Sequence, residues 1–151
     1  VVRSLARHGF RRIVLLPTHG GNFAPLGVAV EKIGPVPGVK IVAFADVGLL
    51  AEAMLGLGAE LGIPAEEGGI HAGEWETSMM LALRPDLTRM ERAEPGYMGG
   101  LLEGIQIMSA QGTDAVSKNG IFGDPRRASA EAGRRYVARI VDRVLDAIAR
   151  A

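Results

Sequence analysis

One short segment carries an unusual density of polar chemistry. The eight residues from His71 to Ser78 (HAGEWETS) contain one imidazole, two carboxylates and two hydroxyls. If a helix begins near His71, the side chains of His71 and Glu74 lie on one face, because residues three apart are neighbours on a helix. That spacing suits two metal ligands, or one ligand beside a general base. The segment therefore predicts part of a metal-dependent hydrolase site.

The same residues also have ordinary structural explanations. Glu74 and Glu76 fall in the first turn of the expected helix, where the helix dipole stabilises carboxylates. Glu76 is a candidate catalytic residue and equally a candidate capping residue. Trp75 is a candidate substrate-binding residue, although its i, i+4 spacing to Met79 favours a place in the core. On the residues alone, the functional and the structural interpretation both stay open.

A second polar cluster follows a strand-like apolar run at residues 13–16. His19 is a candidate metal ligand, because ligands gather where the strands of a parallel sheet end. Gly20 and Gly21 would let the backbone approach a substrate closely, and Asn22 would cap the next helix or orient that substrate. The alternative is a turn histidine beside a glycine loop that binds an anion through its amides.

Strands and helices alternate along the chain. Apolar periodicity predicts helices over residues 1–8, 23–33, 49–61 and 74–83, strands over 13–16 and 40–44, and a final helix that starts near Asp124 or Ser129. Its apolar face is predicted to contain Tyr136, Val137, Ile140, Val141, Val144, Leu145 and Ile148. The glycine-rich stretch 91–123 is predicted to form long loops with short strands, as lid or interface material. This alternation predicts an α/β fold, a three-layer αβα sandwich with a mostly parallel sheet.

Composition excludes several classes of protein. The chain has 151 residues, formal net charge zero, 48% apolar residues and no cysteine, which favours one globular domain without disulfides or thiolate metal sites. A neutral chain without a basic block gives no reason to expect nucleic acid or a membrane as partner. No signal peptide is evident, so we expect a cytoplasmic protein. Without a GxSxG elbow, a serine nucleophile has no support.

The polar clusters, in this order, resemble the creatininase (creatinine amidohydrolase) family. The segment 17–22 (PTHGGN) is similar to that family's Asn-Gly-His-Gly-Gly-Asn loop, with Pro17-Thr18 in place of Asn-Gly. HAGEWETS is similar to its His-Ala-Gly-Glu-x-Glu-Thr-Ser motif. Residues 120–125 (GIFGDP) are similar to its closing signature. Within them, Asp124-Pro125 also has the ordinary interpretation of a capped turn. The resemblance covers nearly the whole chain.

The resemblance implies a creatininase-like sandwich with two divalent metal ions per site, zinc, manganese or iron. His19 matches a metal-binding histidine, Glu74 a ligand of the second metal, and His71 an acid/base residue that protonates the leaving nitrogen. The implied reaction is hydrolysis of a C–N bond in a cyclic or linear amide by metal-activated water. A small-molecule amide such as creatinine or a formamide, or a peptide bond in cofactor maturation, is the implied substrate. Residues 94–119 would shape the pocket, and a homo-oligomer, with a hexamer as one option, is implied.

Two departures from the family pattern affect this expectation. In creatininase a ligating Glu directly precedes the histidine of the second motif, and Ile70 stands there in this chain. The family's Glu-x-His-Gly element and bridging Asp are also missing. We therefore expect residues 1–151 to be a single, amino-terminally truncated creatininase-like domain that lacks its first strand and binds metal poorly. The alternatives are a non-catalytic truncated paralogue or subunit, and an anion-binding α/β module.

Overall fold

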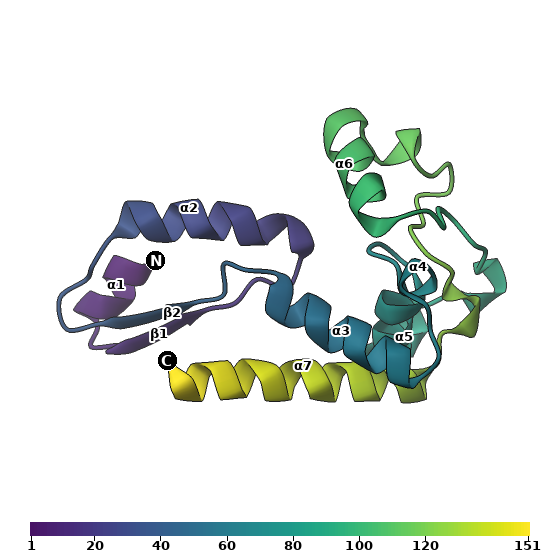
Figure 1. The fold of residues 1–151 in the computed structure, drawn as a ribbon. Helices are drawn as coiled ribbons and strands as arrows, with labels where there is room; N and C mark the ends of the chain where they lie inside the picture. Colours follow the sequence, from purple (N-terminus) through teal and green to yellow (C-terminus); the bar gives the residue numbers. More distant parts are fainter. The chain divides into compact units, whose positions relative to one another are not determined.

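The computed structural model describes all residues, 1–151 (Figure 1). The chain forms two compact units. The first unit contains residues 1–51 and 143–151, and the second unit contains residues 52–142. Two helices, α3 (Gly48–Glu60) and α7 (Ala130–Arg150), have residues in both units.

The first unit is built around two parallel strands. β1 (Arg12–Leu15) pairs with β2 (Lys40–Ala43), with Ile13 opposite Ile41. Helix α2 (Phe23–Ile33) connects the two strands, as a parallel pair requires, and α1 (Val2–Arg7) precedes them. The Arg12 guanidinium donates a hydrogen bond to the carbonyl oxygen of Ile148, which ties β1 to the end of α7.

The α/β class and the parallel pairing predicted from the sequence are confirmed. Ile13, Val42 and Phe44 are buried together with Phe23 of α2, so the β-branched and aromatic residues of the two runs provide the apolar core. Helix α2 has the predicted bounds, 23–33, whereas β1 begins and ends one residue earlier than predicted and β2 ends one residue earlier. Asn22 precedes α2 as predicted, but its side chain makes no capping hydrogen bond.

The second unit is almost entirely helical. Besides its parts of α3 and α7 it contains α4 (Ala65–Gly68), α5 (Glu74–Leu83), α6 (Leu101–Gln111) and the 3-10 turns η2 (Pro85–Leu87), η3 (Met90–Arg92), η4 (Thr113–Ala115) and η5 (Pro125–Arg127). Its core joins α3, α5 and α7 through Leu57, Ile63, Trp75, Ala132 and Tyr136. Helix α5 has the predicted bounds, because Gly73 precedes its first turn and Arg84-Pro85 ends it.

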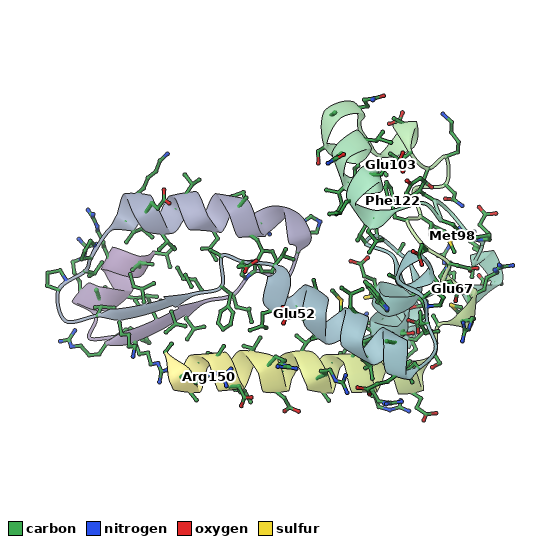
Figure 2. All side chains as sticks on the ribbon, viewed as in Figure 1. Glu52, Glu67, Met98, Glu103, Phe122 and Arg150 are labelled. Carbon is green, nitrogen blue, oxygen red and sulfur yellow. The ribbon has the colours of Figure 1, made fainter.

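The prediction of loops with short strands over residues 91–123 was wrong in part. Helix α6 occupies the middle of this stretch (Figure 2). Within residues 91–123, only isolated bridges at Tyr97 and Phe122 have strand geometry. Gly104 lowers the helix propensity of α6, which obscured the helix in the sequence. In the structure a Cβ at Gly104 would lie 2.8 Å from the Tyr97 ring, so the glycine provides room for that ring.

The final helix begins later than Asp124. Asp124 instead caps the separate turn η5, and the Ser129 hydroxyl caps α7 by accepting a hydrogen bond from the Ala132 amide at 3.1 Å. The predicted apolar stripe of α7 is buried at Tyr136 and Val144, whereas 57% of Leu145 is exposed. No helix of the chain, α7 included, combines the length and the apolar character that crossing a bilayer requires.

Candidate functional site

In the first unit, His19 lies after β1 and makes a contact of its own. Its Nδ1 atom accepts a hydrogen bond from the Gly21 amide at 3.1 Å, so the imidazole caps the turn η1 formed by residues 20–22 (Gly20, Gly21, Asn22). The side chain is exposed. In this arrangement the Gly21 amide occupies Nδ1, and Nε2 makes no hydrogen bond.

In the second unit, the segment before α5 pairs with the closing signature of the chain. The Ile70 amide donates to the Phe122 carbonyl at 3.0 Å, and the Phe122 amide donates to the His71 carbonyl at 2.8 Å. On the other side of Phe122, the Tyr97 amide donates to the Ile121 carbonyl at 2.8 Å. Two of the three predicted motifs are therefore joined by backbone hydrogen bonds.

The turn between His71 and α5 is held by side chains of the helix's first turn. Ala72 has φ +52°, in the left-handed region that residues other than glycine rarely adopt. The Glu76 carboxylate accepts from the Ala72 amide at 2.8 Å, and the Thr77 hydroxyl donates to the Ala72 carbonyl at 3.2 Å. Glu76 thus binds a backbone amide just before the helix, which is a structural role, and its catalytic role stays a prediction.

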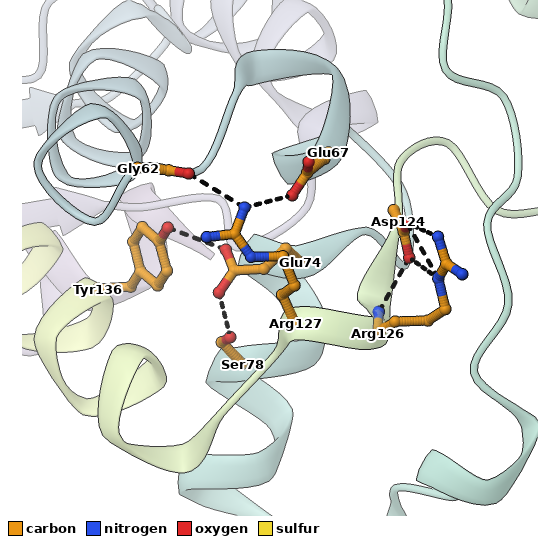
Figure 3. Close-up of polar contacts among 8 residues, drawn as sticks. All are labelled: Gly62, Glu67, Glu74, Ser78, Asp124, Arg126, Arg127 and Tyr136. Atoms are coloured by element: carbon orange, nitrogen blue, oxygen red, sulfur yellow. Dashed lines mark hydrogen bonds and ion pairs between the residues drawn. The ribbon is translucent and has the colours of Figure 1, made fainter.

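Glu74 is buried between α5 and α7 (Figure 3). The Ser78 hydroxyl donates to one of its carboxylate oxygens at 2.7 Å, and the Tyr136 hydroxyl donates to the other at 2.9 Å. Ser78 Oγ in turn accepts from the Ser129 amide at 3.0 Å. Burial, together with the neighbouring Glu74 charge, raises the pKa of Tyr136, so this phenol keeps its proton and remains a donor.

Trp75 lies in the core, which is the structural alternative that its spacing favoured. Only 3% of the residue is exposed, and its neighbours include Leu57, Ile63 and Tyr136. The ring has no open face in this unit on which a substrate could stack, so the structure does not support the substrate-binding assignment. The indole Nε1 has no hydrogen-bond partner in the chain.

His71 differs from the rest of its motif. The side chains of residues 74–78 are buried, packed or hydrogen-bonded within the second unit, whereas the His71 side chain is exposed and makes no hydrogen bond or ion pair with another residue. The exposed imidazole is accessible to a bound molecule, as a general acid or base must be. The motif thus provides one open acid/base group on a well-supported turn.

Two ion pairs fix the closing signature beside this motif (Figure 3). Asp124 binds the Arg126 guanidinium at 2.6 Å, and this hydrogen-bonded arginine lowers the pKa of Asp124. Arg127 binds Glu67 at 2.9 Å and donates to the Gly62 carbonyl at 3.1 Å. Both arginines therefore make structural contacts within the second unit.

The residues of the chain do not fit a two-metal centre on their own. Neither unit contains a group of three or more His, Asp or Glu side chains that could hold a metal ion. Both oxygens of Glu74 already accept hydrogen bonds, and the Nδ1 atom of His19 is occupied. His19 and Glu74 lie in different units, and their roles as metal ligands stay predictions.

The sequence did not reveal the role of Tyr136. It was assigned to the apolar face of the last helix, and its burial there is confirmed, but its hydroxyl provides a bond to Glu74 that no local pattern indicates. The available signal was general, since a buried tyrosine hydroxyl usually finds a partner. Separately, a cleft of about 510 Å³ is lined by residues 94–98 and 116–119, within the stretch expected to shape a pocket.

Comparison with known proteins gives a consistent result. The creatininase family profile, described as creatinine amidohydrolase, matches residues 1–148. The mycofactocin precursor peptide peptidase of Mycobacterium ulcerans is 32% identical over 92% of this chain and 48% of its own length. The protein of the same name from Mycobacterium tuberculosis is 34% identical over 93% of this chain and 49% of its own length.

Solved structures of creatininases have the same fold. A creatinine amidohydrolase (creatininase) has TM-score 0.63 and 29% identity, and the match covers 99% of this chain and 59% of that one. A mutant creatininase of the Zn-Zn type has TM-score 0.65 and 27% identity, over 97% and 58%. A manganese creatininase has TM-score 0.61 and 28% identity, over 97% and 59%. The chain spans about half the length of the curated relatives it matches, and it belongs to the creatininase family of amidohydrolases.

Proposed function

We propose that this chain forms part of a metal-dependent amidohydrolase in which His71 protonates the leaving nitrogen. The observation that carries the proposal is the exposed, unpartnered His71 imidazole at the end of a turn that the rest of its motif holds. Water adds to the amide carbonyl, the C–N bond breaks, and the nitrogen receives its proton from the imidazole. A neutral amine is a far better leaving group than an amide anion, so this proton is required.

A divalent metal in the complete protein is supported by the zinc and manganese forms among the similar structures. Such an ion would polarise the carbonyl and lower the pKa of bound water. The chain's own side chains form no such site. We therefore propose that most of the ligands come from further sequence or from another subunit.

The proposed substrate is an amide bond in a linear peptide. The curated relatives at 32% and 34% identity are named as peptidases of a precursor peptide, which favours a peptide over creatinine or a formamide. The cleft lined by residues 94–98 and 116–119 is consistent with a peptide substrate, because its lining residues include polar ones such as Glu94 and Asn119.

A second candidate is a non-catalytic subunit that supports an oligomer. It is favoured by the absence of a three-residue metal group and by the hydrogen bonds that occupy His19 and Glu74. The anion-binding module is less well supported, because the Gly21 amide that would bind the anion already donates to His19. Light scattering after size-exclusion chromatography tests the homo-oligomer, which remains a proposal.

The test measures amine release from a linear peptide and from creatinine, with zinc or manganese added, by the protein in the form that its gene encodes. His71→Gln should lower the rate on the peptide at least about 100-fold, as expected for loss of a general acid. His8→Gln is the matched control, since His8 is also exposed but only contacts the Ser4 carbonyl. Hydrolysis that His71→Gln leaves unchanged would refute the proposal, and absence of any hydrolysis would favour the non-catalytic subunit.

A further inference from the structure

No hydrogen bond or ion pair from another side chain holds the His71 imidazole, so its polar support comes through the backbone of its own segment. The peptide group between His71 and Ala72 is held by the Phe122 amide, which donates a hydrogen bond to the His71 carbonyl at 2.8 Å. From this peptide group the chain passes through Ala72 to α5. The conformation of Ala72 therefore sets the direction in which His71 leaves the helix.

Ala72 is held in a conformation that it would not adopt readily by itself. With φ +52°, it is the only residue other than glycine with a positive φ in this chain. A left-handed conformation is unfavourable for a residue with a Cβ atom. It persists only when surrounding contacts support it.

Two side chains from the first turn of α5 provide that support. The Glu76 carboxylate accepts a hydrogen bond from the Ala72 amide at 2.8 Å, and the Thr77 hydroxyl donates one to the Ala72 carbonyl at 3.2 Å. The Glu76 bond joins an ionisable carboxyl group to a backbone N–H, the kind of bond that is stronger than one between neutral groups. Glu76 is exposed and makes no other hydrogen bond or ion pair, so the Ala72 amide is its only specific partner.

We infer that Glu76 is a positioning residue, which sets the direction of His71 by holding Ala72 in its left-handed conformation. Because the proposed function gives His71 its role in the reaction, this positioning role rests on that function. Glu76 acts through the backbone and does not itself contact the amide bond of the substrate. A residue that replaces Glu76 should therefore keep this role only if its side chain can accept a hydrogen bond from the Ala72 amide.

The test follows the folded protein by NMR without any substrate. In Glu76→Ala, the Ala72 amide should exchange with solvent at least about tenfold faster relative to the Phe122 amide, since one charge-assisted hydrogen bond is lost. The ring signals of His71 should shift, while those of His8 and His19 stay in place. Glu76→Gln should restore most of both signals, because its amide oxygen can still accept. Glu66→Ala is the matched control, since Glu66 is an exposed first-turn acid of α4 with no such bond.

A role limited to general stability would give a different result. It would raise exchange at Ala72 and Phe122 together, leave their ratio unchanged and leave the His71 signals in place, and that result would overturn the inference. If Glu76→Ala does not fold, Thr77→Val decides, with a smaller change of the same kind expected. If the unaltered protein hydrolyses no amide and Glu76→Ala still shifts the His71 ring signals, the proposed function fails and the positioning role stands.

Discussion

Glu74 is only 1% exposed, and its carboxylate accepts hydrogen bonds from two hydroxyls, those of Ser78 and Tyr136. No arginine or lysine forms an ion pair with it. Burying a carboxyl group is costly unless it is hydrogen-bonded, so the two hydroxyls are what makes this position tolerable. The Tyr136 bond also links α5 to α7.

At this scale, removal of one hydroxyl should be measurable. Tyr136→Phe deletes the donor to Glu74 and leaves a buried carboxylate oxygen without its partner, so we expect the free energy of unfolding to fall by about 1–3 kcal/mol. Tyr97→Phe is the matched control, because the Tyr97 hydroxyl has only long contacts, at 3.4 and 3.5 Å. It should cost no more than about 0.5 kcal/mol. Urea denaturation measures both, and equal losses would show that the Glu74 bond contributes nothing.

Between elements, the contact of α5 with α7 depends on a glycine. Gly133 lies in the second turn of α7, where a Cβ atom would overlap the Ser78 carbonyl oxygen and approach the Ala82 Cβ to 2.9 Å. The helices can approach this closely only because position 133 carries no side chain. The approach also brings the Ser129 amide within 3.0 Å of Ser78 Oγ.

An alanine at position 133 should therefore destabilise the protein, although alanine has a higher helix propensity than glycine. Gly133→Ala should destabilise the protein by about 1–3 kcal/mol, because overpacking of a tight contact exceeds the gain in propensity. Gly56→Ala in α3 is the control, since its nearest atom is the flexible Arg139 Nη1 at 3.8 Å. That substitution should stabilise the protein by about 0.5–1 kcal/mol. Thermal and urea unfolding give the sign of each effect, and the same sign for both would contradict the packing argument.

For the whole molecule, the chain by itself provides too few clustered ligands for a metal site. The family profile matches residues 1–148 of this chain, and the chain spans only about half the length of its curated relatives. Metal sites need ligands in correct number and geometry, and the chain's own residues do not gather in such a group.

Metal content measures this directly. The purified 151-residue chain should contain well below one zinc or manganese ion per chain by elemental analysis, and His19→Ala should match it. His8→Ala serves as the control for a general loss of histidine binding. Near-stoichiometric metal in the unaltered chain that is lost only in His19→Ala would contradict this expectation. It would show that His19 binds the ion after giving up its hydrogen bond with the Gly21 amide.

Local features were predictable from the sequence because their causes lie within about ten residues. Helices α2 and α5 have their predicted bounds, since apolar periodicity and end signals such as Pro85 act on the neighbouring backbone. The parallel pair β1 and β2 followed from two β-branched runs separated by a helix. The three motifs were also evident, and the family match confirms the resemblance that they carried.

Tertiary structure alone decided what each motif residue does. Tyr136 lies 62 positions from Glu74, and Phe122 lies far along the chain from His71, yet their hydrogen bonds define the candidate site. Helix α6 was hidden by Gly104, whose purpose is visible only in the packing of Tyr97 against it. A local pattern reports which conformations a segment favours and which face is apolar. The partner that a buried polar group meets is set by the approach of distant segments, and this is why Glu74 could be recognised as important while its role could not be predicted.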